Sequence, residues 1–593
     1  MSSTTQRSNW RARYAGVVDG HDGLKDYPVL IQKFLLGRGF KDLAEIQNFF
    51  QSKLSDLKEP LLMKDMDKAV ARLVQVFEKQ EKVCVYADFD LDGTSGLALL
   101  TDGLRQLGFK NVFLAQPRRL SDGYGFHAHI VEELARQGVT CIVTVDVGIT
   151  ANKAVATASE LGIDVIVTDH HQPGPVLPPG FAVVNPNQAG DTSGLGYLCG
   201  AGVAFYLLRA LKRGLINKNL IAESTLDLRS VLDCFCIATL TDMVPLVGDN
   251  RSLVKQGLQQ LEKTKRPGLK SLLESLGMSG RPLTSQDVAI RFAPKLNALS
   301  RMEMGVMPID LYVVEDETLA SQMVKTVLKN NSTRVQLQGE GEGEALERLK
   351  AWPHTQFVFF ASRNFHRGVV GLIATKVCQQ TGLPTFIGSI SEEGTITGSA
   401  RLPNGRAESL LTAMQAASSP LIRFGGHDAA AGFELEIGRE DEFVAALAKY
   451  YDSRDFIPAN HEVVFDAPAE LSEMTENFMR WLDSMGPFGA SFAIPVFQFQ
   501  NLLIKDVISL KGGHLKLVVM DPQSLKTAEV LCFSPSAAWV MTAQSGQHVD
   551  LLAEVQWNYF GGYRRIQLLV KDIKSTLLPG SVSTAISSVG ALS

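Results

Sequence analysis

Short apolar runs that alternate with amphipathic helical segments are the feature of this sequence that most restricts its fold. Four such runs follow Lys68, namely VCVYADFD at 83, VFLAQP at 112, CIVTVDVGI at 141 and VIVTDHH at 165. Continuous apolar runs of this kind are typical of parallel strands that are covered on both faces. Helical segments such as 151–161 separate the runs, as a doubly wound sheet requires. We therefore predict an α/β fold with a parallel-sheet core.

Polar side chains stand at the carboxyl ends of three of these runs. They are Asp88, Asp90 and Asp92 in ADFDLDG, Asp146 in TVDVGI, and Asp169, His170 and His171 in VTDHH. In open α/β sheets the carboxyl ends of the strands meet at one edge, and ligands bind there. We therefore expect these residues to form a single site.

The segment ADFDLDG suggests a metal ligand cluster. If the strand continued through it, Asp88, Asp90 and Asp92 would share one face, and Gly93 would let the chain turn around a bound ion. Three carboxylates so close together raise one another's pKa unless a cation neutralises them. A solvated acidic turn is the alternative for this segment alone. An EF-hand is excluded because Leu99 occupies the position of its bidentate glutamate.

The histidines and a later aspartate extend the predicted metal site. Mixed carboxylate and imidazole ligands suit manganese or magnesium, and the histidine favours manganese. ATLTDMVPLVGDN adds Asp242 as a further candidate ligand at the end of a helix. Two metals roughly 3.5 to 4 Å apart are a common means of attacking phosphorus with water. The residues therefore predict a hydrolase of phosphoesters or phosphoanhydrides, without identifying the substrate.

The chain of 593 residues is long enough for several domains of roughly 100 to 200 residues each. A long polar helical stretch over 315–352 is predicted to join two lobes, and a smaller α/β pattern begins at QFVFFAS. Alternating apolar segments after His461 indicate a compact β-barrel, an OB-fold. The predicted boundaries are an N-terminal segment 1–55 with a helix near 43–50, a catalytic core 56–305, a connecting helix 306–352, a second α/β domain 353–455, a barrel 460–574 and a disordered tail 575–593.

Composition excludes some classes of protein. With 58 basic against 63 acidic residues, the net charge of -5 argues against coating nucleic acid by bulk charge, although a local basic groove is compatible with it. The seven cysteines are scattered and contain no C-x-x-C pair, which argues against a zinc site. The N-terminus lacks the apolar stretch of a signal peptide, and no apolar run reaches about 18 residues. We therefore expect a cytoplasmic protein that has no membrane partner.

Seven motifs together resemble the DHH phosphoesterase family and, within it, the RecJ exonucleases. They are ADFDLDG, PRRLSDGYG, TVDVGI, VTDHH, ATLTDMVPLVGDNRSLVKQGL, GSAR and GGHDAAAG, in that order. The resemblance runs from about Val83 to Lys574. It implies a DHH core, a smaller DHHA1 domain and a RecJ-type OB domain.

The resemblance also implies roles for individual residues. Metal ligation falls to Asp90, Asp92, Asp146, His170 and Asp242, and the residues with catalytic roles are His171, Asp169 and Asp88. In this assignment His171 lies close to the scissile phosphate, Asp169 orients the histidines, and Asp88 stands beside the metal cluster. The implied substrate-binding residues are Arg119, Arg301, Ser399, Arg401, Gly425, Gly426 and His427. Arginine suits this role because it meets phosphate through two hydrogen bonds.

Two further groups of residues complete the sequence predictions. Gly368, Val369 and Gly371 are expected to provide tight helix packing within the second α/β domain. In the barrel, aromatic and basic residues form a cluster of the type that holds single strands by stacking and phosphate pairing; they are Trp557, Tyr559, Phe560, Tyr563, Arg564 and Arg565.

The function implied by the resemblance is 5′ to 3′ hydrolysis of single-stranded DNA to 5′ mononucleotides in repair and recombination, with two divalent cations, Mn²⁺ or Mg²⁺. The partners would be single-stranded DNA with a 5′ end, a single-strand-binding protein and a helicase, and the chain is expected to be a monomer. One alternative is a DHH phosphoesterase that acts on short oligonucleotides or cyclic dinucleotides. Another is a non-catalytic scaffold like Cdc45, which the filled ligand positions disfavour.

Overall fold

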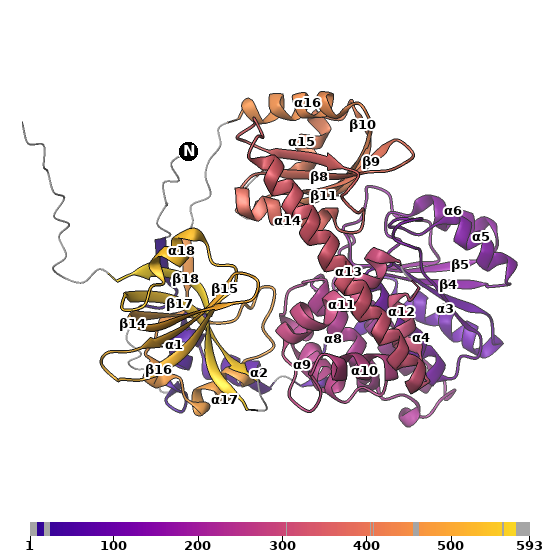
Figure 1. Ribbon diagram of the computed structural model, residues 1–593. Helices are drawn as coiled ribbons and strands as arrows, with labels where there is room; N and C mark the ends of the chain where they lie inside the picture. Colours follow the sequence, from indigo (N-terminus) through magenta and orange to yellow (C-terminus); the bar gives the residue numbers. More distant parts are fainter. Residues whose placement is uncertain are drawn as a thin grey trace, which may run out of the picture. The chain divides into compact units, whose positions relative to one another are not determined.

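The protein separates into two compact units (Figure 1). The computed structural model describes residues 9–16, 24–51, 53–303, 305–403, 405–406, 408–454, 462–559 and 563–576. The larger unit contains the described residues from 53 to 454 together with 489–492, and the smaller unit contains the others. The larger unit has two sheets joined by a long helix, and the smaller unit has a β-barrel together with the N-terminal segment.

A five-stranded parallel sheet forms the centre of the first lobe of the larger unit. Its strands lie in the order β3-β2-β4-β5-β6, and every neighbouring pair is parallel. They are β2 (Val83–Ala87), β3 (Val112–Ala115), β4 (Cys141–Val145), β5 (Asp164–Thr168) and β6 (Ala182–Val184). Every residue of β2 and β4 is buried, as expected of central strands covered on both faces. The predicted α/β fold with a parallel-sheet core is confirmed.

Alternate residues of β2 point to opposite faces of this sheet, and each face has its own hydrophobic core. Val83 and Val85 belong to the core that includes α3 (Met66–Lys79), α4 (Leu91–Leu107) and α7 (Gly200–Asn217). Cys84 and Tyr86 belong to the core that includes α5 (Ala128–Arg136) and α6 (Asn152–Glu160). The first core also takes in α8 (Leu232–Thr241), α9 (Gly248–Glu262), α10 (Pro267–Ser275), α11 (Ala293–Met302) and α12 (Pro308–Val313).

Helix α13 (Glu317–Leu349) connects the first lobe to the second. Asp316 caps its start, because the Asp316 carboxylate accepts a hydrogen bond from the Leu319 N–H at 2.6 Å. The second sheet has the order β10-β11-β9-β8-β7, in which only β7 and β8 are parallel. Its strands and helices are β7 (Val358–Ser362), α14 (Val370–Thr381), β8 (Thr385–Ile390), β9 (Thr395–Arg401), α15 (Leu410–Ala416), β10 (Leu421–His427), β11 (Ala430–Glu436) and α16 (Glu440–Asp452).

The smaller unit is built on a closed β-barrel. Its strands are β14 (Val496–Leu510), β15 (His514–Met520), β16 (Thr527–Cys532), β17 (His548–Asn558) and β18 (Arg565–Ser575), with α17 (Glu476–Ser484) before them and α18 (Ala537–Thr542) between β16 and β17. The order β14-β15-β16-β18-β17 closes because β17 also pairs with β14. Closure removes the exposed sheet edges, and the predicted OB-type barrel is confirmed. The tail from 577 onward lies outside the described residues.

The N-terminal segment packs on this barrel unit. Strand β1 (Asn9–Ala12) pairs in parallel with β12 (Glu462–Phe465), while α1 (Val29–Gly37) and α2 (Leu43–Gln51) follow β1. Arg38 forms an ion pair with Asp466 at 2.6 Å, and the Trp10 indole N–H donates to Asp572 at 2.7 Å. The segment thus has a structural partner that its own sequence does not reveal, although its helix near 43–50 is confirmed as α2.

Apolar and sulfur-containing residues serve the cores of these units. All seven cysteines are buried and form no disulfides, so they act as small core side chains.

Among the described helices, none combines the length and the hydrophobicity needed to span a bilayer.

Candidate active site

Polar loops that follow three parallel strands meet at the carboxyl edge of the first sheet. Asp88 follows β2, Asp146 follows β4, and Asp169 follows β5. The Nε2 atom of His170 lies 3.1 Å from Asp146 Oδ1 and 3.8 Å from Asp92 Oδ2. The structure therefore brings predicted residues from three separate motifs into one site.

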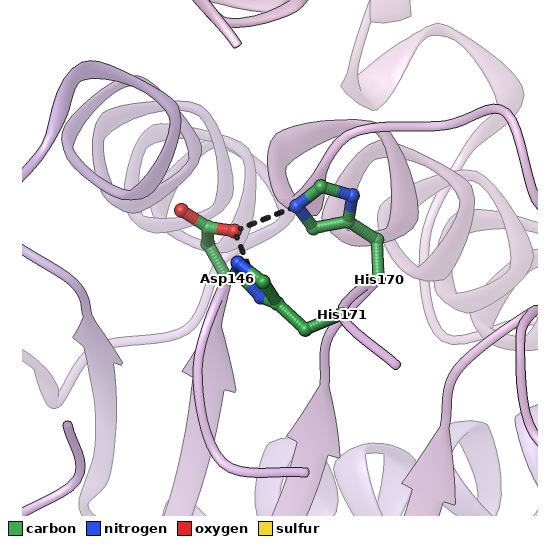
Figure 2. A group of neighbouring side chains, drawn as sticks. All are labelled: Asp146, His170 and His171. Atoms are coloured by element: carbon green, nitrogen blue, oxygen red, sulfur yellow. Dashed lines mark ion pairs between the residues drawn. The ribbon is translucent and has the colours of Figure 1, made fainter. Parts of the chain in front are cut away.

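Asp146 lies at the centre of this site. Figure 2 shows the rings of His170 and His171 directed at its carboxylate, with the His171 Nδ1 atom 3.8 Å from Asp146 Oδ1. Asp146 has a φ of +61°, a conformation that aspartate adopts more readily than most residues. A Cβ atom on Gly200 would lie 2.4 Å from Asp146 Cβ, so a glycine is needed where α7 begins.

The three aspartates of ADFDLDG do not share a strand face, and that expectation is wrong. Strand β2 ends at Ala87, which leaves Asp88 in the turn, Asp90 at the N-cap of α4 and Asp92 in its first turn. The Asp90 side chain accepts a hydrogen bond from the Gly93 N–H at 3.0 Å. This capping interaction starts the helix immediately after the strand, so the alternation in sequence reflects a cap rather than a continued strand.

Helix ends hold two further carboxylates in the site. Asp92 accepts hydrogen bonds from the N–H groups of Gly200 at 2.6 Å and Ala201 at 2.8 Å, at the N-terminus of α7. Asp242 stands at the end of α8, and its Oδ2 atom lies 3.6 Å from His170 Nε2. The candidate ligand from the ATLTDMVPLVGDN segment therefore joins the candidate ligands from the strand ends.

Burial favours the neutral form of the carboxyl groups in this site. Burial and neighbouring aspartate charges raise the pKa of Asp88 and that of Asp242 to about 8. The same causes raise the pKa of Asp146 well above its ordinary value. Burial also raises the pKa of Asp92. Carboxylates that remain ionised here at neutral pH therefore need positively charged partners.

Several buried polar atoms of the site make no hydrogen bond within the described chain, as expected of atoms that bind a metal ion. Within the described part of the chain, no hydrogen-bond partner exists for Asp88 Oδ1, Asp146 Oδ1, His170 Nε2 and Asp242 Oδ2. Two overlapping sets of ligand atoms could each hold an ion, one from Asp146, His170 and His171 and one from Asp92, His170 and Asp242. Such mixed carboxylate and imidazole sets suit Mn²⁺ and also accept Mg²⁺. The residues present therefore fit divalent cations.

Asp169 sets the orientation of the adjacent histidines. Its Oδ1 atom lies 2.8 Å from His171 Nδ1 and accepts the His170 backbone N–H at 2.7 Å, while Oδ2 accepts the Ile149 N–H at 3.0 Å. Burial alone would raise the pKa of Asp169, but the hydrogen bond from His171 lowers it overall. Burial would lower the pKa of His171, but the hydrogen bond to Asp169 raises it to about 9. The Nδ1 atom of His171 is thus engaged, which leaves Nε2 to face a substrate.

Substitution of Asp169 tests this orienting role. In an asparagine, the amide N–H₂ would face at least one of the N–H groups that now donate to Asp169, and that hydrogen bond would be lost. We therefore expect Asp169→Asn to lower the rate of phosphoester hydrolysis by about 10- to 100-fold. Asp164→Asn, at the opposite end of β5, is the matched control, because Asp164 is 42% exposed and pairs with Arg72 away from the site. Equal rates for the two variants, measured at saturating Mn²⁺, would contradict the assignment.

Four arginines from four different segments, Arg119, Arg301, Arg334 and Arg401, lie close to one another beside this site. Burial and the charges of Arg119, Arg334 and Arg401 lower the pKa of Arg301 on α11 to about 10. The Arg119 guanidinium lies 4.3 Å above the Phe89 ring, and Arg401 donates to Ser399 Oγ at 2.7 Å. Among the described residues, no carboxylate forms an ion pair with Arg301, Arg334 or Arg401. A group of guanidinium ions without acidic partners favours an anionic ligand such as phosphate.

Arg334 is the member of this group that the sequence does not reveal. It lies on α13, in a polar stretch whose charges resemble those of any solvated helix. Arg334 donates to Gln338 at 2.7 Å and to Asn331 at 3.2 Å, while its buried Nε atom has no partner within the described chain. Only the packing of α13 against α11 brings it near Arg301.

The second sheet groups the remaining predicted substrate residues. Strand pairing places them in two rows, Ser399–Gly432–Gly425 and Arg401–Ala430–His427. Gly426 has a φ of +135°, and a Cβ there would lie 2.7 Å from the Ala430 carbonyl oxygen. The GSAR and GGH segments therefore flank β11 at one end of this sheet, although they are distant in sequence.

The barrel carries part of the predicted aromatic and basic cluster on its surface. The Arg564 guanidinium lies 4.5 Å above the Trp557 ring, whose N–H donates to Asp483 at 2.9 Å. Tyr563 is 74% exposed. Phe560 lies outside the described residues. Exposed stacking and basic groups of this kind suit a single-stranded nucleic acid.

Comparison with known proteins identifies relatives for each part of the chain. Three family models match, the N-terminal domain of the DHH family over residues 82–239, the DHHA1 domain over 354–453 and the RecJ OB domain over 465–572. The single-stranded-DNA-specific exonuclease RecJ of Salmonella typhimurium strain LT2 is 30% identical over 561 residues, 92% of this chain and 96% of that protein. The protein of the same name from Escherichia coli is 30% identical over 569 residues, with the same coverage of both chains.

A solved structure matches over nearly the whole chain. The crystal structure of RecJ from Thermus thermophilus in complex with Mn²⁺ has a TM-score of 0.79 and 26% sequence identity. The match covers 97% of this chain and 80% of that one. The similarity therefore extends beyond the separate domains to their order along one polypeptide.

Proposed function

Because the chain belongs to the RecJ family of single-stranded-DNA-specific exonucleases, we propose that it removes nucleotides one at a time from the 5′ end of single-stranded DNA. The enzyme is a metal-dependent exonuclease that uses Mn²⁺ or Mg²⁺. One observation carries the proposed polarity. A cluster of metal-type ligands lies beside a separate group of arginines that have no carboxylate ion-pair partners within the described chain.

The ligand residues would hold two cations between the parallel strands and α8. His170 belongs to both candidate sets of ligand atoms, Asp146 and Asp92 approach it from different loops, and Asp242 approaches it from the end of α8. Asp90 adds negative charge from the cap of α4. Divalent cations bound there make water a stronger nucleophile and neutralise charge on the phosphate.

Although His171 belongs to one of the two candidate ligand sets, we assign it to the phosphate rather than to a cation. Its Nδ1 atom is held by Asp169, and the resulting rise in pKa favours the protonated imidazole. A protonated ring donates a hydrogen bond from Nε2, which suits a phosphate oxygen that gains charge during hydrolysis. Asp169 keeps this donor in place through its four hydrogen bonds, which come from His170, His171 and Ile149.

The arginine group would bind the 5′ phosphate of the strand. Arg119, Arg301 and Arg401 supply guanidinium groups from both lobes of the larger unit, and Ser399 supplies a hydroxyl. A terminal phosphate held there allows only the nearby phosphodiester to reach the metal ligands, so each cleavage releases one nucleotide. Gly425, Gly426 and His427 would line the neighbouring strand path in the second lobe.

Several finer properties belong to the same proposal. We propose that the protein acts in DNA repair and recombination and works as a monomer in the cytoplasm. A helicase and a single-strand-binding protein would supply its substrate. The barrel, with Trp557, Tyr563 and Arg564, supports a polymeric substrate over short oligonucleotides or cyclic dinucleotides. Four of the five predicted ligands, Asp92, Asp146, His170 and Asp242, belong to the candidate ligand sets, whereas Asp90 caps α4; these four argue against a Cdc45-like scaffold.

Strands labelled at one end test the polarity and the substrate together. We expect purified protein with Mn²⁺ to release labelled mononucleotide at once from a 5′-labelled single strand, and only late from a 3′-labelled one. Duplex DNA of the same sequence is expected to resist, and excess EDTA is expected to stop hydrolysis because it removes the cations. Early release of the 3′ label, or cleavage that survives EDTA, would contradict the proposal.

A further inference from the structure

The backbone of Leu120 is held from two sides. Its N–H donates to Glu303 Oε1 at 2.7 Å, and its carbonyl oxygen accepts from Arg367 Nη1 at 2.9 Å. Glu303 follows α11 in the first lobe, whereas Arg367 lies in the loop between β7 and α14 of the second lobe. Since Leu120 directly follows Arg119, these two hydrogen bonds set the backbone from which Arg119 projects.

Arg119 depends on that backbone for its position. Its guanidinium lies over the Phe89 ring, and its buried Nε atom has no hydrogen-bond partner among the described residues. Neither this ring contact nor the attraction of Asp90, Asp88 and Glu303 fixes the guanidinium through a hydrogen bond within the described chain. The direction in which Arg119 reaches therefore follows from the placement of residues 119 and 120.

The residue after Arg367 contacts a second member of the arginine group. Arg301 Nη1 donates to the Gly368 carbonyl oxygen at 3.2 Å. A Cβ on Gly368 would lie 2.2 Å from the Arg301 backbone oxygen, so the approach requires glycine. The expectation that Gly368 packs within its own lobe is therefore wrong, whereas Gly371 does lie against Arg401 and Ser399 of that lobe.

We infer that Arg367 and Glu303 are positioning residues that set Arg119 for the 5′ phosphate, so that the phosphate pocket is complete only when the second lobe contacts the first. The inference rests on the proposed recognition of the 5′ end. Glu303 is informative because a carboxylate repels phosphate. Any favourable effect of Glu303 on phosphate binding must therefore act through the position of Arg119, either by way of the Leu120 N–H or by attraction between the Glu303 carboxylate and the Arg119 guanidinium.

The test compares kcat/KM for single strands that end in a 5′ phosphate or a 5′ hydroxyl, using the full chain with Mn²⁺. The ratio of the two values is independent of the fraction of active protein. We expect Arg367→Met to lower this ratio about 10-fold, since it removes a hydrogen bond from a charged donor. Arg367→Lys is expected to retain part of the ratio, because an ammonium group can also donate to the Leu120 carbonyl. Arg363→Met is the control, because Arg363 is exposed in the same loop and has no hydrogen bond or ion pair within the described chain.

A pair of variants at Glu303 separates positioning from charge. Glu303→Met removes the acceptor for the Leu120 N–H, whereas Glu303→Gln removes only the negative charge and keeps an acceptor. If Glu303 acts by positioning Leu120, the ratio of the two kcat/KM values should fall about 10-fold in Glu303→Met and stay near the wild-type value in Glu303→Gln. A direct charge effect, whether repulsion of the phosphate or attraction of Arg119, predicts that both variants change the ratio equally.

The outcomes distinguish this inference from the proposed function. A wild-type preference for 5′ phosphate that survives in Arg367→Met, or equal ratios for the two Glu303 variants, would overturn the inference alone. A wild-type enzyme that does not distinguish the two strand ends would overturn the proposed 5′-end recognition, and the inference would fall with it.

Discussion

Replacement of Asp146 by asparagine is expected to lower Mn²⁺-dependent hydrolysis of single-stranded DNA by about 100-fold or more, because residues that merely support metal ligands already contribute about 10- to 100-fold. Asp146 Oδ1 lies 3.1 Å from His170 Nε2 and lacks a hydrogen-bond partner in the described chain. The amide of asparagine carries no negative charge, and its N–H₂ group cannot bind a cation. The rate of DNA hydrolysis by Asp146→Asn should therefore stay low at every Mn²⁺ concentration that the assay can use.

Thermal unfolding provides a second measurement on the same variant. Mn²⁺ is expected to raise the melting temperature of the wild type, since a ligand that binds only the folded state stabilises it. It should raise the melting temperature of Asp146→Asn by less, because one of the two candidate ligand sets contains Asp146. In EDTA the variant is expected to be at least as stable as the wild type, because a buried amide beside Asp92 and Asp169 avoids the repulsion between carboxylates.

A matched control excludes a general effect of removing one negative charge. Asp67→Asn changes an exposed residue of α3 and should keep both the rate and the Mn²⁺-dependent rise in melting temperature. If Asp146→Asn hydrolysed DNA at the wild-type rate, or gained as much stability from Mn²⁺, the metal site would have to lie elsewhere.

Replacement of Arg301 by methionine is expected to lower kcat/KM for strands with a 5′ phosphate by roughly 30-fold, because truncating one partner of a buried charge pair costs about 2 kcal/mol or more. Strands that end in a 5′ hydroxyl should lose much less. The stability of the free protein is expected to rise or stay level, since burial and the charges of three other arginines already disfavour the Arg301 guanidinium.

The combination of lower activity and undiminished stability separates a binding residue from a structural one. Arg334→Met should show a smaller loss of the same kind, because Arg334 contributes to the same cluster from α13. Arg136→Met, on the exposed face of α5, should change neither quantity. Equal losses on phosphorylated and unphosphorylated strands would show that Arg301 does not bind the 5′ phosphate. Both strand ends should be assayed at the same Mn²⁺ concentration.

The sequence predicts much of the metal site because that site follows from local patterns. Parallel strands end at one edge of their sheet, so polar residues that follow β2, β4 and β5 must come together once the order of the strands is correct. The pattern misleads at ADFDLDG, where Asp90 caps α4 and ends the strand early. Alternation over five residues cannot distinguish a strand from a strand followed by a helix cap.

The arginine group that we propose binds the 5′ phosphate is less accessible to sequence reasoning. Arg119, Arg301 and Arg401 stand out only through the resemblance to a family, since single arginines are common on surfaces. Arg334 and Arg367 have no signature at all, because each acquires its role from a contact between elements that are far apart in the chain. Physical contacts of this kind depend on how helices and loops pack, which no local pattern encodes.

By itself the sequence determined the parallel sheet, the β-barrel and the identity of the residues at the strand ends. Burial of alternating or continuous apolar runs leaves few other folds for such segments. The tertiary structure alone decided which residues outside the motifs complete the sites. It brought Arg334 beside Arg301, set Arg367 against Leu120, and paired the N-terminal segment with β12. These pairings depend on shape and distance across separate elements, and those quantities exist only once the chain has folded.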